Sequence, residues 1–330
     1  MKKIFITGGA GYCGSRLVPF LLKKKFKITV YDILYFGKKF LPKHKNLKII
    51  KGDIRDTKHL EKTCKDHDIF INLSCISNDA SFELDKNLSK TINLDAFEPM
   101  VKIAKKNGIK RFIYASSSSV YGLSKKRNVK ENHPLVPLTL YNKYKGMCEP
   151  KLFKHTDENF TGIVFRPATV CGFAPRLRLD LSVNILTTHA YFNNKILVFG
   201  GKQLRPNLHV QDYCDALLKL IKTDKKLVQN EIFNVGYQNM SILNIAKKVK
   251  KIVEKKLKKK ISLQIVKSND NRSYHINSDK IKDKIKFKPK YSIDYAVNEL
   301  CDEFKKNKIK NVFKKNVYYN VKTLMKINAK

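Results

Sequence analysis

The chain has 330 residues, 42% of them hydrophobic, which is enough to bury a sizeable core and excludes a disordered chain. No run approaches the roughly 18–20 uninterrupted apolar residues of a membrane-spanning helix, so we expect a soluble protein without a targeting segment. The seven cysteines are odd in number, scattered and without Cys-x-x-Cys pairing. This pattern favours a reducing cytoplasm and indicates no metal site.

The formal charge of +40, from 68 basic and 28 acidic residues, would on its own favour an acidic partner such as nucleic acid, an anionic membrane or a phosphorylated metabolite. The basic residues are 59 Lys and only 9 Arg, and the Lys residues are spread along the whole chain. Specific recognition of phosphates and bases depends on the forked guanidinium of Arg. We therefore interpret the charge as a bias toward Lys on solvated faces, and expect no specific nucleic-acid partner and no membrane association.

The first half of the chain alternates strand-like and helix-like segments. A β-rich run at 3–7 precedes a glycine-dense turn, apolar residues at helical spacing follow from position 16, and 28–31 is again strand-like. Further strands are expected at 47–50, 69–73, 111–115 and 161–165, and helices at 59–64, 93–105 and 141–155. Because parallel strands need crossover connections, this rhythm predicts an α/β fold with a doubly wound parallel sheet.

The rhythm changes after Arg166, where prolines interrupt the pattern and three of the nine arginines fall within thirty positions: Arg176, Arg178 and Arg205. A strand at 231–235 is expected to return to the sheet, and 242–253 reads as an amphipathic helix. We therefore predict a main domain of residues 1–170 plus about 208–236. A smaller, discontinuous α/β lobe of about 171–207 plus 237–330 would bind the ligand at the strand ends.

The motif Thr-Gly-Gly-Ala-Gly-Tyr-Cys-Gly at 7–14 lies directly after the first strand and opens the first helix. Gly8 permits the tight turn, Gly11 lets the backbone approach a pyrophosphate, and Gly14 lets the helix pack closely. The helix N-terminus supplies free N–H groups for phosphates. Asp32, at the end of the second strand, can accept both ribose hydroxyls and would repel a 2′-phosphate, which favours NAD over NADP. The alternative is a glycine-rich turn of another α/β protein, with Asp32 a strand-end cap.

Tyr141 and Lys145 lie one helical turn apart and so share a helix face. A phenol has a pKa near ~10, and an adjacent ammonium is expected to lower the Tyr141 pKa toward the range of a working base. A serine run at 116–119 follows a predicted strand and could hold the substrate oxygen. Tyr-x-x-x-Lys alone is common and would favour a structural pair, but its order after the glycine turn and the serine run favours catalysis.

These motifs together resemble the extended short-chain dehydrogenase/reductases, in particular the NAD-dependent sugar-nucleotide epimerases and dehydratases. The resemblance covers nearly the whole chain. It rests on the segments at 7–14, 52–54, 115–122, 141–145, 166–172 and 205–212, and on Asn93.

The resemblance implies a role for individual positions. It assigns catalysis to Ser117, Tyr141 and Lys145. It assigns cofactor binding to Gly8, Gly11, Tyr12, Cys13, Gly14, Asp32, Asp53, Ile54, Leu73, Ser74, Asn93 and Pro167. It places at the substrate Asp79, Thr169, Asn184, Arg205, Arg272 and Tyr274. Arg205 and Arg272 would grip the nucleotide diphosphate, and Tyr274 would wall the sugar pocket.

Two departures from the family pattern bear on the reaction. Family 4,6-dehydratases carry Asp-Glu directly after the catalytic hydroxyl, because elimination of water needs an acid and a base there. This chain has Ser118-Ser119 instead, which disfavours dehydration. Thr169 stands where galactose epimerases carry Asn, which leaves the sugar open.

Three further residues keep two interpretations each. Asp79 could bond sugar hydroxyls or act as an acid/base, or it could belong to an ordinary turn. Asn184 could meet the nucleotide or be a solvated helix position. His209 is expected to order its loop rather than perform chemistry.

The sequence thus predicts NAD-dependent epimerisation of a nucleoside-diphosphate sugar through a transient 4-keto intermediate. The alternatives are a 4-ketoreductase or dehydrogenase on the same kind of substrate, and a non-catalytic dinucleotide-sensing protein. The resemblance also implies a homodimer formed by the helices near 93–105 and 141–155.

Overall fold

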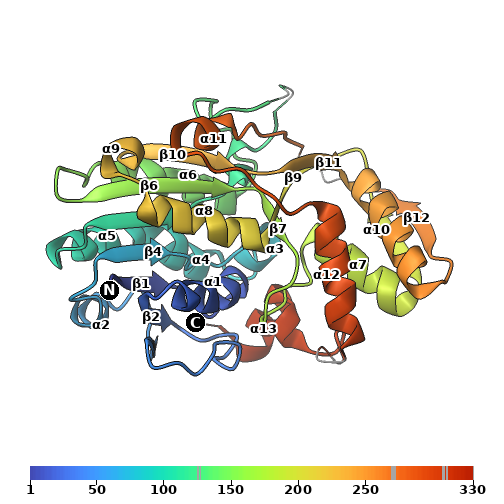
Figure 1. The fold of residues 1–330 in the computed structure, drawn as a ribbon, viewed down its shortest axis with the longest axis horizontal. Helices are drawn as coiled ribbons and strands as arrows, with labels where there is room; N and C mark the ends of the chain where they lie inside the picture. The colour runs from blue at the N-terminus through green and yellow to red at the C-terminus, as the bar shows by residue number, and fades with distance from the viewer. Residues whose placement is uncertain (125, 127, 269–272, 307–308, 310, 330) are drawn as a thin grey trace.

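The computed structural model describes residues 1–330 except 125, 127, 269–272, 307–308, 310 and 330 (Figure 1). The strands are β1 (Lys3–Thr7), β2 (Lys27–Asp32), β3 (Leu47–Lys51), β4 (Ile69–Asn72), β5 (Arg111–Ala115), β6 (Thr161–Pro167), β7 (Thr169–Cys171), β8 (Lys195–Phe199), β9 (Leu204–His209), β10 (Glu231–Val235), β11 (Gln238–Ser241) and β12 (Ser262–Val266). The longer helices are α1 (Tyr12–Lys23), α5 (Phe97–Lys106), α6 (Leu140–Phe153), α7 (Ser182–Asn193), α8 (Val210–Lys222), α10 (Ile242–Leu257) and α12 (Ile293–Lys305). Shorter ones are α2 (Thr57–Thr63), α3 (Asp79–Phe82), α4 (Lys86–Lys90), α9 (Lys225–Val228), α11 (Asp279–Ile285) and α13 (Asn320–Ile327), with the π-helical turn η1 (Thr91–Asp95) and the 3-10 turns η2 (Ser118–Tyr121) and η3 (Asn316–Tyr318).

The central sheet has seven strands in the order β10-β6-β5-β4-β1-β2-β3, and each pair is parallel. The strand order reverses between β1 and β4. The Thr7 hydroxyl donates to the Asn72 side chain there, at 2.9 Å. In sheets of this kind, the crevice at the carboxyl ends beside such a reversal is where ligands bind. The predicted doubly wound α/β fold is confirmed.

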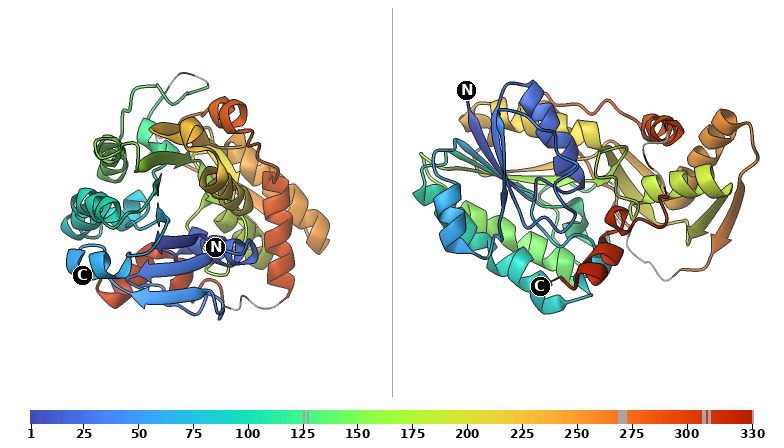
Figure 2. Two further views of the ribbon diagram at one scale, coloured as in Figure 1. Left: turned by 60° about the vertical axis from the view of Figure 1, so that its left-hand side comes forward. Right: turned by 90° about the horizontal axis from the view of Figure 1, so that it is seen from below.

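Helices cover both faces of this sheet, as Figure 2 shows in its right-hand view. Successive residues of β1 point to opposite faces: Ile4 and Ile6 pack in the core under α1 and α8, and Phe5 packs in the core under α2, α5 and α6. Because both faces are buried, the strands are apolar throughout rather than alternating.

The smaller lobe is built mainly from α7, α10 and α12 around the two-stranded sheet of β8 and β12. A three-stranded sheet, β11-β9-β7, lies between this lobe and the main domain. Two helices from the segment expected in the smaller lobe pack elsewhere. α11 packs against β10, and α13 contacts α3 with Leu324 in the core of the main domain.

The largest local departure from the expected elements is the helix at 93–105. Its place is taken by the end of the turn η1, which follows α4, and by α5, which begins at Phe97. The Ala96 N–H bonds the Thr91 carbonyl at 3.0 Å, five residues back, as a π-helical turn requires. The extra residue in this turn shifts the helical register, which apolar spacing alone does not reveal.

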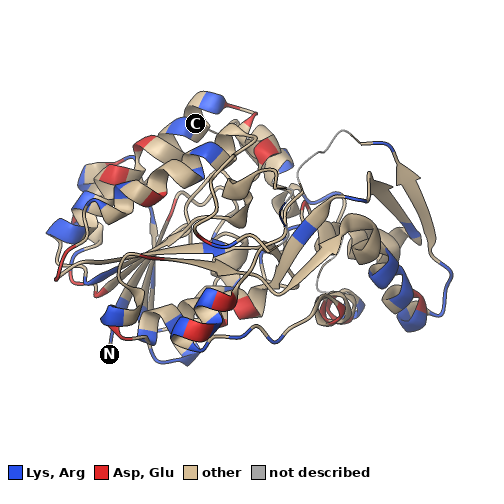
Figure 3. Cartoon of the chain, turned by 90° about the horizontal axis from the view of Figure 1, so that it is seen from above, with Lys and Arg blue, Asp and Glu red and all other residues tan. Residues whose placement is uncertain are grey.

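Lys and Arg positions, coloured along the ribbon in Figure 3, occur on both lobes, and α10 carries several. Within the described residues, no helix combines the length and the apolarity needed to cross a membrane.

Candidate active site

A cavity of about 870 Å³ opens at the carboxyl ends of the central strands and extends under the smaller lobe. Its wall includes most of the residues predicted from sequence. These are Gly8, Gly11, Tyr12, Cys13, Gly14, Asp32, Asp53, Ile54, Leu73, Ser74, Asp79, Ser117, Tyr141, Lys145, Pro167, Thr169, Arg205 and Tyr274.

Two positions of the glycine turn, Gly8 and Gly14, have no room for a side chain. Gly8 has a φ of +72°, and a Cβ there would lie 2.6 Å from the Ser74 nitrogen. A Cβ on Gly14 would lie 2.3 Å from the carbonyl oxygen of Gly9. Gly11 is the N-cap of α1 and has no side chain to bond the first turn. The backbone N–H groups of that turn therefore stay available at the positive end of the helix dipole, beside the cavity.

Asp32 is held at the end of β2 by two backbone donors, Ala10 N at 2.9 Å and Leu34 N at 2.7 Å. Burial raises the pKa of this carboxyl, and the two hydrogen bonds oppose the shift. Asp53 also lines the cavity, but its carboxylate is engaged by Arg55, with Nη2 2.6 Å from Oδ2. The Asp53 carboxylate is therefore already paired within the protein.

Helix α6 carries Tyr141 and Lys145 on its cavity side and is fixed at both ends. The Thr139 hydroxyl accepts from Asn142 N at 3.3 Å and donates to Asp79 at 2.6 Å, which ties the helix start to α3. Further along, Glu149 forms a buried ion pair with Arg166 of β6 at 2.5 Å. The helix is thereby locked onto the sheet.

The Ser117 hydroxyl belongs to a short hydrogen-bonded chain. Its Oγ lies 2.8 Å from the Ser119 Oγ, and Ser119 Oγ donates to the Asn142 side-chain oxygen at 2.5 Å. Because the Ser119 proton points to Asn142, the Ser117 proton points to Ser119. Asn142, next to Tyr141 on α6, thus orients both hydroxyls.

The electrostatic surroundings of Tyr141 differ from those expected. Burial raises the pKa of the Tyr141 phenol well above its ordinary value, the Cys75 thiol adds to the rise, and the Arg178 guanidinium opposes it. The Lys145 ammonium instead donates to the Ala115 carbonyl at 2.7 Å and lies 5.0 Å from the Tyr114 ring centroid. The main cation lowering the Tyr141 pKa here is Arg178 rather than the expected Lys145, whose ammonium is bonded at the end of β5.

Comparison with known proteins agrees with this geometry. Residues 4–236 match the model of the NAD dependent epimerase/dehydratase family. The chain belongs to this family. It is 28% identical to a UDP-glucose 4-epimerase of Lactobacillus helveticus over 75% of this chain and 81% of that one. It is 25% identical to a human dTDP-D-glucose 4,6-dehydratase, over 77% and 74%.

Solved structures of family members have the same fold. A UDP-glucose 4-epimerase of Thermotoga maritima, determined with UDP-glucose, superposes with a TM-score of 0.82 at 24% identity, covering 92% of this chain and 99% of that one. A UDP-N-acetylglucosamine 4-epimerase of Methanobrevibacter ruminantium, with UDP-N-acetylmuramic acid, gives 0.80 at 25% identity over 92% and 99%.

NAD is the cofactor of this epimerase/dehydratase family, and the cavity fits it. The turn at Gly8 is packed so closely that only its backbone atoms can lie beside a ligand. The start of α1 has no side-chain cap, so its backbone N–H groups can donate to a diphosphate. Asp32, with one backbone bond on each carboxylate oxygen, keeps further acceptor positions for ribose hydroxyls.

Two residues predicted at the ligands lie outside the cavity wall. The Asn93 side chain makes paired bonds with the backbone of Ile76, at 2.8 and 2.9 Å, and so supports the loop after β4. Asn184 is fully buried; its side chain accepts from Gly172 N at 2.9 Å and donates to the Arg178 carbonyl at 2.9 Å. Neither expected position for Asn184, at the nucleotide or in solvent, is observed, because its amide is used inside the protein.

The remaining substrate candidates surround the far half of the cavity. Thr169 is on β7, Arg205 is on β9 and Tyr274 is buried beside them. Asp79 is at the start of α3, where it accepts from Thr139. Arg272 lies outside the described residues.

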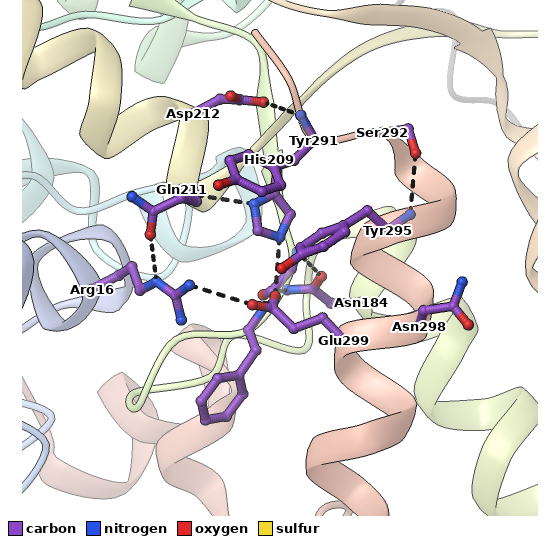
Figure 4. Close-up of polar contacts among 12 residues, drawn as sticks. Arg16, Asn184, His209, Gln211, Asp212, Tyr291, Ser292, Tyr295, Asn298 and Glu299 are labelled. Carbon is purple, nitrogen blue, oxygen red and sulfur yellow. Dashed lines mark hydrogen bonds and ion pairs between the residues drawn. The ribbon is translucent and has the colours of Figure 1, made fainter.

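A polar network between α1, α8 and α12 anchors the segment that follows β7 (Figure 4). Gln211 N donates to His209 Nδ1 at 3.1 Å, so the ring carries its proton on Nε2, 3.0 Å from Glu299. Glu299 also accepts from Phe173 N at 2.8 Å. Burial alone would raise the Glu299 pKa, but the bond from His209 helps to lower it. His209 orders this segment, as the sequence predicts.

Sequence reasoning did not assign several residues of the cavity wall: Cys75, Ser119, Asn142, Arg176 and Arg178. Arg178 is ion-paired with Asp180 at 2.6 Å. The concentration of arginines after Arg166 was the available signal for the last two. Ser119 belongs to the serine run at 116–119, whereas Cys75 and Asn142 carry no pattern of their own in the sequence.

Proposed function

We propose that this protein catalyses NAD-dependent epimerisation of a nucleoside-diphosphate sugar at C4, through a transient 4-keto sugar. One observation carries the proposal: Ser117, Tyr141 and Lys145 line the same cavity as the glycine turn. Of the two residues that follow Ser117, the one that lines the cavity is Ser119, which carries a hydroxyl rather than a carboxylate.

The protein's residues would divide the work as follows. The glycine turn and Asp32 hold NAD, which supplies a hydride acceptor and donor at its nicotinamide. The Tyr141 phenolate takes the proton from the sugar C4 hydroxyl and later returns it. Ser117, positioned through Ser119, would donate to the same sugar oxygen once its proton turns from Ser119 to the substrate. Lys145 fixes the end of β5 through Ala115, and so the position of Ser117.

Dehydration is disfavoured by the residues after Ser117. Loss of water from C5 and C6 needs a carboxylic acid and a base near the sugar. Ser118 is buried and its hydroxyl has no hydrogen-bond partner within the described part of the chain, and Ser119 is bound to Asn142. Neither hydroxyl titrates in the range of a working acid or base.

The nucleotide sugar itself is to be found by direct assay. Purified protein is incubated separately with UDP-glucose, UDP-N-acetylglucosamine, UDP-glucuronic acid and dTDP-glucose, and products are followed by proton NMR without added NADH. The C4 epimer of one sugar is the expected product. A 4-keto-6-deoxy sugar would overturn the proposal in favour of a dehydratase, and turnover only with stoichiometric NADH would favour the ketoreductase alternative.

We also propose a homodimer formed through α5 and α6. Met147 on α6 is 41% exposed, and an apolar side chain on an outer helix face is suited to such an interface. Light scattering should give twice the chain mass of 38.2 kDa, and Met147→Lys should give the single-chain mass. A wild-type monomer would contradict this.

A further inference from the structure

The segment 173–181, between β7 and α7, carries a guanidinium into the dinucleotide end of the cavity. Arg176 is 1% exposed and lines the cavity. Its backbone N–H donates to the Ser15 hydroxyl of α1 at 3.1 Å, so the residue lies over the first turn of that helix. A residue far along the chain thus stands beside the glycine turn.

The Arg176 charge is incompletely compensated. Among the described residues its guanidinium makes one hydrogen bond, from Nη2 to Asn320 Oδ1 at 2.6 Å, and no carboxylate lies within ion-pair distance of it. Its Nε is buried and has no partner among these described residues. A buried arginine in this condition is strongly destabilising unless an anion completes it. Burial lowers the Arg176 pKa to about 9, and the charge of Arg178 acts in the same direction.

The surroundings of Arg176 favour an anion at one particular place. The guanidinium carbon lies 3.7 Å from the Phe36 ring centroid. Stacking on a ring face leaves the N–H groups, which lie in the guanidinium plane, directed sideways. Arg176 is close enough to Asp32 and Cys13 to lower the pKa of both, so it lies near the ribose carboxylate and the first turn of α1. This is the position of a diphosphate bridge bound to the glycine turn.

We propose that Arg176 is a ligand of the NAD diphosphate, and that the segment 173–181 retains the cofactor between turnovers. The uncapped N-terminus of α1 and the unpartnered Arg176 nitrogen would bind the same diphosphate from opposite sides. Arginine suits this role because its fork can bind two phosphate oxygens at once. The inference depends on NAD being the cofactor and not on the reaction or the sugar.

Anchoring of the segment supports a retaining role. At its start, Glu299 binds Phe173 N, and Asn184 binds the Arg178 carbonyl. Near its end, Leu179 N bonds the Tyr318 carbonyl at 2.8 Å. A segment fixed at these points keeps Arg176 in place without help from the ligand.

The test compares Arg176→Met with Arg205→Met, both freed of nucleotide and checked for folding by circular dichroism. Calorimetric titration with NAD should show about 10- to 100-fold weaker binding for Arg176→Met and no change for Arg205→Met. ADP-ribose, which has the diphosphate but no nicotinamide, should lose the same factor. Titration with UDP should show the reverse order of effects.

Two results would overturn the proposal. One is that Arg176→Met binds NAD as tightly as wild type. The other is that it weakens UDP and not NAD, which would place Arg176 at the substrate diphosphate. If Arg176→Met does not fold, Arg176→Lys keeps the charge but loses the fork, and should bind NAD with intermediate affinity and release it on gel filtration. Because these readouts are binding constants, they remain informative if the epimerase assay fails.

Discussion

The Lys145 ammonium donates to the Ala115 carbonyl at 2.7 Å, and so joins α6 to the end of the strand that leads into Ser117. The lysine is 3% exposed. In this arrangement the lysine acts on the position of Ser117, the proposed catalytic hydroxyl, while Arg178 is the main cation that acts on the Tyr141 phenol.

Replacing the phenol tests whether Tyr141 is the base. Tyr141→Phe should lower kcat by about 10²- to 10⁴-fold, because proton transfer to a positioned side chain contributes a factor of this size. NAD content after gel filtration should equal that of wild type. Retention of near-full kcat would contradict the mechanism.

The pH dependence of the rate should respond to Arg178. The base works deprotonated, so the rate rises with pH through the Tyr141 pKa, which burial raises. Arg178 lowers this pKa; its removal in Arg178→Met should therefore move the rising limb of kcat to higher pH. Arg178→Lys keeps the charge and should keep the limb close to that of wild type. An unmoved limb in Arg178→Met, or one at lower pH, would show that the guanidinium does not act on the base.

Ser118 and Ser119 form a matched pair for testing the hydroxyl chain. Ser119→Ala removes the link between Ser117 and Asn142, and should lower kcat by about 10-fold with little change in KM, since the lost bond orients a group that acts in the transition state. Ser118→Ala removes a buried hydroxyl that no described residue bonds, so kcat should not change. Equal effects of the two substitutions would argue against the chain.

The buried Arg166–Glu149 pair should be essential for stability. Arg166→Met leaves the Glu149 carboxylate buried and uncompensated, and should lower the free energy of unfolding by about 3–5 kcal/mol in urea titrations. Lys102→Met is the control, because its pair with Glu98 spans 3.9 Å and the lysine is 62% exposed. A variant as stable as wild type would show that Ser116, which also donates to Glu149, is a sufficient partner.

The elements around the glycine turn could be predicted because their signals are local. A strand, a turn closed by Gly8 and Gly14, and an acidic residue at the next strand end define the dinucleotide site within about 30 residues. The pairing of Tyr141 with Lys145 follows from the helical repeat alone. Each of these positions lines the cavity.

Other features depend on contacts between distant segments. Asn184 is turned inward because Gly172 and Arg178 offer backbone groups that only the folded segment brings together. The direction of the Lys145 ammonium is set by the carbonyl of Ala115, thirty residues earlier. Helical spacing indicates that Lys145 and Tyr141 share a face, but not which partner the ammonium selects.

Asn320, at the start of α13, holds both Arg176 and, through its Nδ2 at 2.8 Å, the Ser77 hydroxyl after β4. The ribosome makes residue 320 long after the glycine turn has emerged, and the early strands can pair before it arrives. The dinucleotide pocket of the nascent chain thus stays open on one side until this late helix docks. A fusion partner that delays the docking would yield chains with a formed sheet and no retained cofactor.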